Sequence, residues 1–411
     1  MTGYKIVKKG RKGYILPLPP LSLLKSIESR LQYTKQGAEF FPSPHWAIVK
    51  LFSVKTASFP WGLLSDVLNV CETWMTFKDD TFKVIQLRKD KPQVIFDEKL
   101  RLYQRDAIQS LVDNNGGILS MPTGSGKTFT AIAFLNLHKK KSLVIVPTTY
   151  LVSQWKKQTP DYVDVRTYQG IKDYSILQDY EIVVFDECHH CSASTLYKIA
   201  MKLKEQIVVG LSATTFREDG EEMKMHGALG PIIYNISLRE LINQGYLCDA
   251  TVLWIDLVKH TPGICTDYQD IYKEYIVENE ERNNAIVSVC GKGNVLILVG
   301  QIEHGEALLE LLKDEDAIFL CSKSKEMDID HRIIIATSIF DEGVDLPERD
   351  VIIMAAGGKS SVKTTQRIGR VLRTHPGKDK ALIIDFVDRA KYLFKHYKRR
   401  KEMYVEYGFD R

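Results

Sequence analysis

Short runs of consecutive apolar residues alternate with longer, helix-like stretches between residues 91 and 245. Uninterrupted apolar runs of this kind are typical of strands that are buried on both faces of a parallel sheet. Strands that alternate with helices along the chain predict a doubly wound α/β domain over residues 91–245. The runs are residues 117–120, 142–147, 181–190 and 206–214, and the first helix candidate is 129–137.

The same alternation returns between residues 246 and 411, which predicts a second α/β domain in the C-terminal part of the chain. Residues 1–90 precede both series and are predicted to form a small α+β domain. The strand candidates of the second series are residues 251–257, 295–299, 332–336, 351–354 and 381–386, with a helix candidate at 304–313.

The composition is that of an ordinary globular protein, because 44% of the 411 residues are apolar and 26% are charged. No apolar run reaches the length that a membrane-spanning helix requires. The seven cysteines are dispersed and odd in number, which argues against a disulfide framework and for a reducing compartment. These features together favour a cytoplasmic protein without a membrane partner.

Charge is unevenly distributed along the chain. Residues 1–90 contain 14 Lys and Arg residues against 7 Asp and Glu residues, although the net charge of the whole chain is only +4. The remaining 321 residues therefore carry a net charge of −3. A polyanion partner and a solvated basic surface explain the basic segment equally well. Its interleaved aromatic residues can stack on bases, but most are expected in the core: Tyr14, Trp46, Phe52, Trp61 and Trp74.

A glycine-rich stretch between the first apolar run and the first helix candidate has the features of a phosphate-binding loop. Its sequence, Met121-Pro-Thr-Gly-Ser-Gly-Lys-Thr128, departs from the strict pattern at the first position, where methionine replaces glycine. Gly124 and Gly126 allow backbone N–H groups to approach phosphate oxygens beside a helix N-terminus. Lys127 is expected to reach the β/γ-phosphates and Thr128 to hold Mg²⁺. The predicted phosphate-binding residues are Thr123, Gly124, Ser125, Gly126, Lys127 and Thr128.

Two carboxylates end the third apolar run, at the edge of the sheet where the phosphate loop also lies. Asp186 is expected to hold Mg²⁺ through water, and Glu187 to orient and deprotonate the attacking water. The stretch Cys188-His-His-Cys191 has the outline of half a zinc site. No second Cys/His pair with metal spacing follows, so zinc is not predicted there.

Two further groups are candidates for nucleotide contacts. The Gln104 side chain offers a donor and an acceptor, as an adenine edge requires. On a helix, Gln366, Arg370 and Arg373 share one face because they recur at i, i+4 and i+7. Arginines from a second domain can act on a γ-phosphate that the first domain holds. A solvated basic helix face is the alternative.

The order of these motifs resembles that of the superfamily 2 helicases and translocases, over roughly residues 95–390. Leu211-Ser-Ala-Thr-Thr-Phe-Arg-Glu-Asp219 resembles the XPB branch, and the compact length resembles phage branch-migration helicases of the UvsW type. The Asp-Glu-Cys-His form differs from the Asp-Glu-Ala-Asp of typical RNA helicases, which disfavours RNA as the substrate. The ordered set is Gln104, 121–128, 147–148, 167–169, 186–189, 212–214, 336–347 and 366–373.

The resemblance implies a fold with two tandem RecA-like doubly wound parallel-sheet domains, at 91–245 and 246–411. The small α+β domain at 1–90 would then be an accessory, DNA-binding domain. ATP and Mg²⁺ are the implied cofactors, and the implied nucleotide-binding residues are those of the phosphate loop with Gln104, Asp186, Gly343 and Asp345. The implied catalytic residues are Lys127, Glu187, Arg370 and Arg373.

The resemblance also implies residues that couple hydrolysis to DNA and residues that contact the strand. A turn or capping role is nearly as probable for each strand-contacting threonine. The implied coupling residues are His189, Ser212, Thr214 and Gln366. The implied strand contacts are Thr148, Thr167, Arg217 and Thr337.

The implied function is an ATP-dependent DNA helicase or translocase that unwinds or remodels branched DNA in recombination, repair or replication. Its partners would be single-stranded, forked or branched DNA, with recombination or replication proteins, in a bacterial or phage-infected cell. The alternatives are an ATPase motor subunit of a restriction or repair complex, an RNA helicase, and a nucleic-acid-binding module with an inactive ATPase site.

Overall fold

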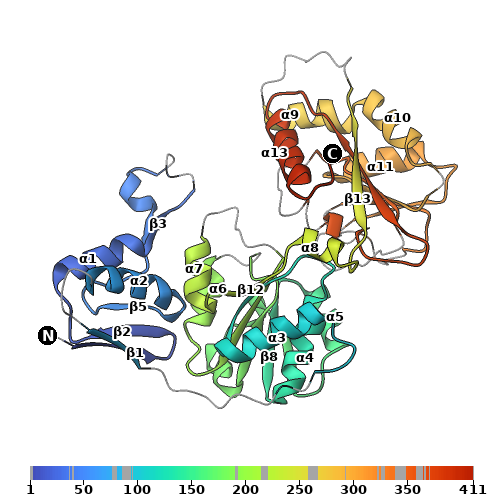
Figure 1. The fold of residues 1–411 in the computed structure, drawn as a ribbon. Helices are drawn as coiled ribbons and strands as arrows, with labels where there is room; N and C mark the ends of the chain where they lie inside the picture. The colour runs from blue at the N-terminus through green and yellow to red at the C-terminus, as the bar shows by residue number, and fades with distance from the viewer. Residues whose placement is uncertain are drawn as a thin grey trace. The chain divides into compact units, whose positions relative to one another are not determined.

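The structure is a computed structural model, drawn as a ribbon in Figure 1. None of the helices that it describes combines the length and the apolar character that a bilayer crossing needs. The described residues are 3–36, 38, 41–75, 81–85, 94, 96–189, 193–213, 221–257, 267–291, 293–321, 324, 329–337, 349–357, 364, 367–369 and 371–410.

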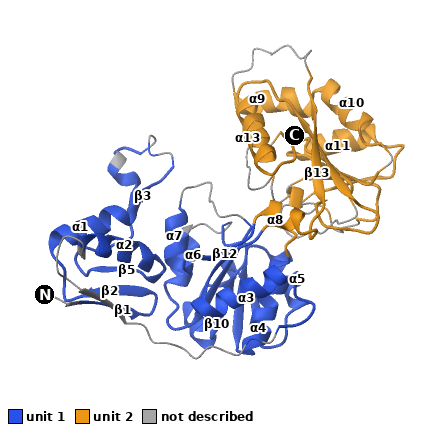
Figure 2. Ribbon diagram, in the orientation of Figure 1, with its two compact units in different colours: residues 1–121, 126–236 blue, residues 122–125, 237–411 orange. Residues whose placement is uncertain are grey.

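The chain forms two compact units (Figure 2). The first comprises residues 1–121 and 126–236, and the second comprises residues 122–125 and 237–411. The predicted boundaries at residues 90 and 245 remain predictions, since the N-terminal residues and the first α/β sheet lie within one unit.

The N-terminal part of the first unit, residues 3–75 with β6, is an α+β module. Strands β1 and β2 form an antiparallel hairpin at the centre of a four-stranded sheet in the order β5-β2-β1-β6. Helices α1 and α2 pack against each other. The elements are β1 (Gly3–Lys9), β2 (Lys12–Leu16), α1 (Leu21–Arg30), β3 (Gln32–Thr34), β4 (Ile48–Lys50), β5 (Ser58–Pro60), η3 (Trp61–Leu63), α2 (Leu64–Met75) and β6 (Thr81–Ile85).

Most of the aromatic residues singled out in this module belong to its core, as predicted. Phe52 is buried, and Trp61 and Trp74 pack against the same apolar cluster. Tyr14 alternates with the buried Ile15 along β2 and therefore faces outward. Trp46 also lies outside the core, because 69% of its surface is exposed.

The module docks on helix α7 of the same unit. The Arg11 guanidinium is buried and donates to the carbonyl oxygen of Ala228 at 2.6 Å. Burial lowers the pKa of Arg11 to about 10, against the opposing effect of Glu205. A Cβ at Gly62 would lie 1.9 Å from the carbonyl oxygen of His226, so only glycine permits this approach. The module is thus an integral part of the first unit.

A six-stranded parallel sheet forms the centre of the first unit, in the order β12-β7-β11-β10-β8-β9. The four apolar runs predicted as strands form its four interior strands. The elements are α3 (Leu102–Asn114), β7 (Gly116–Ser120), α4 (Lys127–His138), β8 (Ser142–Val146), α5 (Thr149–Lys156), β9 (Val163–Thr167), η4 (Tyr168–Gly170), η5 (Tyr174–Asp179), β10 (Ile182–Phe185), α6 (Ala193–Ala200), β11 (Ile207–Ser212), α7 (Glu222–Leu229) and β12 (Ile232–Asn235).

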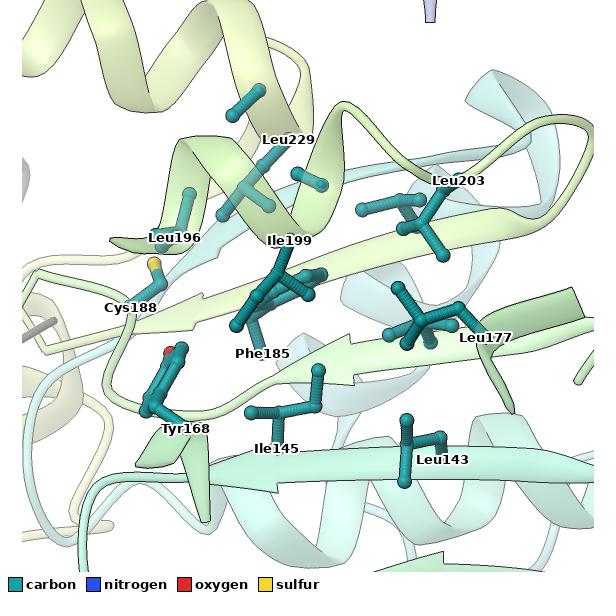
Figure 3. Close-up of a cluster of buried hydrophobic side chains, with 14 of the residues drawn as sticks. Leu143, Ile145, Tyr168, Leu177, Phe185, Cys188, Leu196, Ile199, Leu203 and Leu229 are labelled. Atoms are coloured by element: carbon teal, nitrogen blue, oxygen red, sulfur yellow. The ribbon is translucent and has the colours of Figure 1, made fainter. Parts of the chain in front are cut away.

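One face of this sheet is covered by α6 and α7 (Figure 3). Alternate strand residues point to this face: Ile145 and Phe185 toward Ile199 of α6, and Leu143 toward Leu177. Because every residue of the interior strands is buried, both faces of the sheet are covered, as their uninterrupted apolar runs predict.

The second unit contains another six-stranded parallel sheet, in the order β13-β18-β17-β14-β16-β15. The five predicted strands are all present, which confirms the two tandem parallel-sheet domains. The elements are α8 (Leu238–Asn243), β13 (Asp249–Ile255), α9 (Tyr268–Tyr272), α10 (Glu280–Ser288), β14 (Val295–Leu298), α11 (Ile302–Leu311), β15 (Ala317–Leu320), β16 (Ile333–Ala336), β17 (Val351–Ile353), β18 (Lys380–Phe386) and α13 (Leu393–Glu406).

A buried ionic network ties the last helix of the chain to this sheet. Arg400 of α13 donates to both Asp385, at 2.8 and 3.0 Å, and Asp388, at 2.9 Å. Arg282 of α10 donates to Asp388 at 2.7 Å. Burial opposes the charge of Asp388, but the two arginines outweigh it and lower its pKa. Two arginines and two carboxylates therefore share one site in which each charge has a partner.

Acid is expected to destabilise the second unit through His304 of α11. Its Nε2 lies 2.9 Å from Asn283 Oδ1, and burial, followed by the charge of Arg282, lowers its pKa to about 3. The unfolded chain binds this proton near pH 6.5, so stability is lost progressively as the pH falls from there toward 3. Between pH 8 and pH 5, His304 should lower the free energy of unfolding by about 2 kcal/mol.

Urea unfolding of the full chain at pH 8, 6.5 and 5 would measure this loss. The control is His304→Gln, which keeps a donor for Asn283 but does not titrate. The variant should lose less stability than the wild type over the same interval. Equal pH dependence in both proteins would refute the role of His304.

Candidate active site

The glycine-rich loop begins where the interior strand β7 ends. Met121 donates its backbone N–H to the carbonyl oxygen of Ser212 at 2.9 Å, which aligns the ends of β7 and β11. Gly126 has a φ of +80° and precedes the first turn of α4, which starts at Lys127. The loop thus leads into a helix N-terminus at the carboxyl edge of the sheet, where an anion is favoured.

The departure from the strict phosphate-loop pattern has a structural reason. Met121, which occupies the position of the first glycine, is completely buried. Its side chain therefore contributes to the core below the loop, and the loop itself keeps glycine at Gly124 and Gly126, both with positive φ.

Gln104 lies beside this loop. A Cβ at Gly126 would be only 2.7 Å from its Nε2, so the two residues are in close contact. Its Oε1 accepts the backbone N–H of Arg101 at 3.0 Å, which caps the N-terminus of α3. The cap fixes the amide beside the phosphate loop.

The Lys127 ammonium lies between the loop and the predicted catalytic carboxylate. Its Nζ donates to the carbonyl oxygen of Met121 at 3.2 Å and lies 3.6 Å from Glu187 Oε1. Since Lys127 is buried, its attraction to Glu187 is screened less than it would be in water.

Asp186 follows the last residue of β10, and its carboxylate is buried. Its Oδ2 accepts the indole N–H of Trp155 at 2.8 Å, and its Oδ1 accepts the backbone N–H of Glu187 at 2.9 Å. Burial and then the charge of Glu187 raise the pKa of Asp186 to about 6, against the opposing effects of Trp155 and Lys127. A nearby cation would stabilise the ionised form.

Glu187 connects the phosphate loop with the end of β11. Its φ of +43° is uncommon for a residue other than glycine and strains the backbone by about 1–3 kcal/mol. Its Oε2 lies 3.5 Å from His189 Nδ1, which in turn lies 3.0 Å from Ser212 Oγ. Lys127, Glu187, His189 and Ser212 thus form a continuous row of polar groups along the carboxyl edge of the sheet.

Two family descriptions match the chain, one in each parallel-sheet domain. Residues 97–179 and 164–217 match the "Type III restriction enzyme, res subunit", and residues 314–375 match the "Helicase conserved C-terminal domain". The first match contains the phosphate loop and the Asp186–His189 motif. The second match contains β15, β16 and β17 of the second parallel sheet.

Curated relatives include DNA motors of archaea and phages. The chain is 25% identical to "DNA 3'-5' translocase XPB2" of Sulfurisphaera tokodaii, over 74% of this chain and 85% of that protein. It is 24% identical to "ATP-dependent DNA helicase uvsW" of Enterobacteria phage T4, over 85% of this chain and 86% of that protein. This chain belongs to the superfamily 2 helicases, in the branch of XPB and UvsW.

The fold of this helicase also occurs in restriction enzymes. The fragment of a putative HsdR subunit of a type I restriction enzyme from Vibrio vulnificus matches with a TM-score of 0.56 and 20% identity, over 73% of this chain and 66% of that one. Several other curated relatives are longer, since the helicase spans 64%, 52% and 54% of the length of three of them.

Two of the threonines predicted to contact a DNA strand are capping residues in the helicase. Thr148 Oγ1 accepts the N–H of Leu151 at 3.4 Å at the start of α5. Thr167 Oγ1 accepts the N–H of Gly170 at 3.1 Å. Capping uses a lone pair of each hydroxyl and leaves its proton able to donate to a phosphate oxygen.

The other predicted coupling, strand-contacting and second-domain residues of the helicase lie in its second unit or outside the described part. Thr337 is buried directly after β16, and its N–H donates to Leu320 O at 3.2 Å. Arg373 is half-buried, and its backbone forms an isolated bridge with Leu247. The predicted residues outside the described ranges are Thr214, Arg217, Gly343, Asp345, Gln366 and Arg370.

Two residues at the site of the helicase were given no role by the sequence reasoning, although Tyr168 lies within the motif at 167–169. Trp155 donates to the Asp186 carboxylate, and Tyr168 donates its hydroxyl to the carbonyl oxygen of the same residue at 3.2 Å. Both side chains are buried. A buried Trp or Tyr usually needs a partner for its N–H or O–H, which is the only signal that could have suggested them.

Proposed function

We propose that the protein is an ATP-dependent DNA translocase or helicase that unwinds or remodels branched DNA. The observation that carries this proposal is the row from Lys127 through Glu187 and His189 to Ser212, which joins a phosphate loop to a possible relay within one sheet edge. The named activities of XPB2 and UvsW support the assignment to DNA.

The residues at this edge fit a nucleotide with Mg²⁺. A buried carboxylate and a threonine hydroxyl supply oxygen ligands for Mg²⁺, and a lysine beside a helix N-terminus favours phosphate. We propose that Asp186 and Thr128 hold Mg²⁺, that Thr123–Thr128 hold the phosphates, and that Gln104 contacts the adenine. Bound Mg²⁺ would neutralise charge that develops on the phosphates.

Each remaining group of the row has a proposed task in hydrolysis. Glu187 accepts the proton of the attacking water, and Lys127 stabilises charge on the β/γ-phosphates. His189 links Glu187, where ATP is hydrolysed, to Ser212 at the end of β11. Together with Thr214 and Gln366, these residues couple ATP hydrolysis to the contact with DNA. Arg370 and Arg373 stabilise the γ-phosphate in the transition state, with Gly343 and Asp345 near the nucleotide.

Translocation follows if the two units alternate their grip on one strand during the ATP cycle. We propose that Thr148, Thr167, Arg217 and Thr337 contact the strand backbone. Contacts with phosphates rather than base edges make such binding independent of sequence and sensitive to salt.

The deciding experiment is ATPase activity with single-stranded, duplex, forked and four-way DNA and with RNA. A DNA translocase should be stimulated by DNA, and most by forked or four-way substrates. Stimulation by RNA alone would favour an RNA helicase. Absence of ATP hydrolysis with every substrate would refute the proposal and favour a binding module.

A motor subunit of a restriction or repair complex is the second candidate, because the first family match carries a restriction-enzyme description. Such a subunit would hydrolyse ATP on DNA but would not unwind forks or move junctions by itself. Strand-displacement assays with the purified chain separate the two functions.

The outer face of the β1–β2 hairpin is the proposed accessory DNA contact. Lys5, Lys9 and Lys12 are exposed on it, and Lys9 lies 6.0 Å from the ring of Tyr14. Replacing the three lysines with glutamine should weaken DNA binding. It should also reduce the slope of log affinity against log salt by about 2–3, if each contacts one phosphate.

The matched control is the same exchange at Lys139, Lys140 and Lys141, which precede β8 and so lie at the opposite, amino edge of the sheet. The control should bind DNA with an unchanged salt slope. If both triple variants behave alike, the hairpin face is not a specific DNA contact.

A further inference from the structure

Trp155 lies in the last turn of α5 and is 1% exposed. Its indole N–H points at Asp186 and donates to Oδ2 at 2.8 Å. A buried indole N–H needs an acceptor, and a backbone carbonyl would serve. Packing alone therefore does not explain why the acceptor of Trp155 is a carboxylate of the candidate active site. A hydrogen bond to an ionised acceptor is also stronger than one to a neutral acceptor.

The two oxygens of this carboxylate are held from two directions. Oδ1 accepts the N–H of Glu187, the next residue along the chain, at 2.9 Å. Oδ2 accepts the donor from Trp155, which is 31 positions away and belongs to another element. Rotation of the carboxylate would break one bond or both, so Trp155 fixes its orientation relative to α5.

The opposite end of α5 is a proposed contact with the DNA strand. Thr148 caps the N-terminus of this eight-residue helix. At a rise of about 1.5 Å per residue, the capped end lies roughly 10 Å from the turn that carries Trp155. One short, rigid element therefore has the proposed strand contact at one end and a bond to Asp186 at the other.

We propose that Trp155 is a positioning residue that holds the Asp186 carboxylate ready for Mg²⁺ and ties its orientation to α5. This inference rests on the proposed function of Asp186 and Thr148. Through α5, the DNA strand would then have a second connection to the nucleotide site, separate from the connection through His189 and Ser212. A residue that only fills the core would affect stability but not Mg²⁺.

The first test is Trp155→Phe, which keeps an aromatic ring and removes the N–H donor. Binding of a fluorescent ATP analogue is followed while Mg²⁺ is titrated. Loss of such a supporting hydrogen bond typically costs about 10–100-fold in metal affinity, so the Mg²⁺ midpoint should rise by that factor. Binding of the analogue in EDTA should be unchanged, and stimulation of ATPase by DNA should fall.

Tyr180→Phe is the matched control. Tyr180 belongs to the buried cluster on one face of the same sheet, and its hydroxyl donates to Asp164 at 2.6 Å, away from Asp186. Thermal unfolding of Trp155→Phe and Tyr180→Phe measures how much stability each variant loses with its hydrogen-bond donor. Only Trp155→Phe should change the Mg²⁺ midpoint. If that variant does not fold, 3-benzothienylalanine at position 155 replaces the N–H with sulfur and keeps the bicyclic shape.

A double-mutant cycle with Asp186→Asn decides whether Trp155 acts through the carboxylate. In the Asp186→Asn background, Trp155→Phe should cause no further rise in the Mg²⁺ midpoint. Additive losses, or an unchanged midpoint in Trp155→Phe with wild-type Asp186, would overturn the inference. A wild-type protein that DNA does not stimulate would instead refute the proposed function, and so the two failures are distinguishable.

Discussion

Replacement of Glu187 by glutamine is expected to lower ATP turnover by about 10²–10⁴-fold while nucleotide binding is retained. The amide cannot accept a proton from the attacking water, but it has nearly the shape of the carboxylate. Its contact with Lys127, where Oε1 lies 3.6 Å from Nζ, supports binding only indirectly. Phosphate release at saturating DNA measures turnover, and equilibrium binding of an ATP analogue measures affinity.

The control for this variant is Glu181→Gln, which removes a similar charge at the exposed residue preceding β10. Its turnover should equal that of the wild type. Near-normal hydrolysis by Glu187→Gln would show that another group accepts the proton.

Arg370→Ala should reduce turnover by about 10³–10⁵-fold and leave ATP affinity much less changed. An arginine that acts on the transition state contributes little to ground-state binding, so the loss appears in kcat rather than in affinity. Single-turnover hydrolysis with saturating ATP and DNA separates the two quantities.

Arg373→Ala tests the neighbouring candidate, and Arg399→Ala, on the exposed side of α13, is the control. A parallel fall of affinity and turnover in Arg370→Ala would identify a ground-state ligand or a structural residue. An effect confined to Arg373→Ala would assign the transition-state role to that residue.

In the two parallel sheets, the strands that sequence reasoning missed share one property. β9, β12 and β15 each lie at the edge of a sheet and therefore pair with only one neighbour. An edge strand is partly exposed, so it mixes polar residues with apolar ones, as in Val163-Asp-Val-Arg-Thr167. Interior strands are buried on both faces and were recognisable from their apolar runs alone.

The residues of the candidate site also fall into those that could be recognised from the sequence and those that could not. Its motif residues were recognisable because phosphate binding and proton transfer require particular residue types at fixed spacing. Trp155 and Tyr168 were not, because a buried aromatic residue is usually explained by packing. Their partner became visible only when the fold placed α5 and η4 beside Asp186. The strained φ of Glu187 likewise has no signature in its residue type.

The docking of the N-terminal module on α7 has a consequence for biosynthesis. The partners Arg11 and Ala228 are 217 positions apart. At about 5–20 residues per second, a ribosome would take roughly 10–30 seconds from Gly62 to its α7 partner His226. The module's own apolar cluster, from Tyr4 to Cys71, can form early. Its docking face around Gly62 would stay uncovered throughout that interval, as a surface for chaperones to protect.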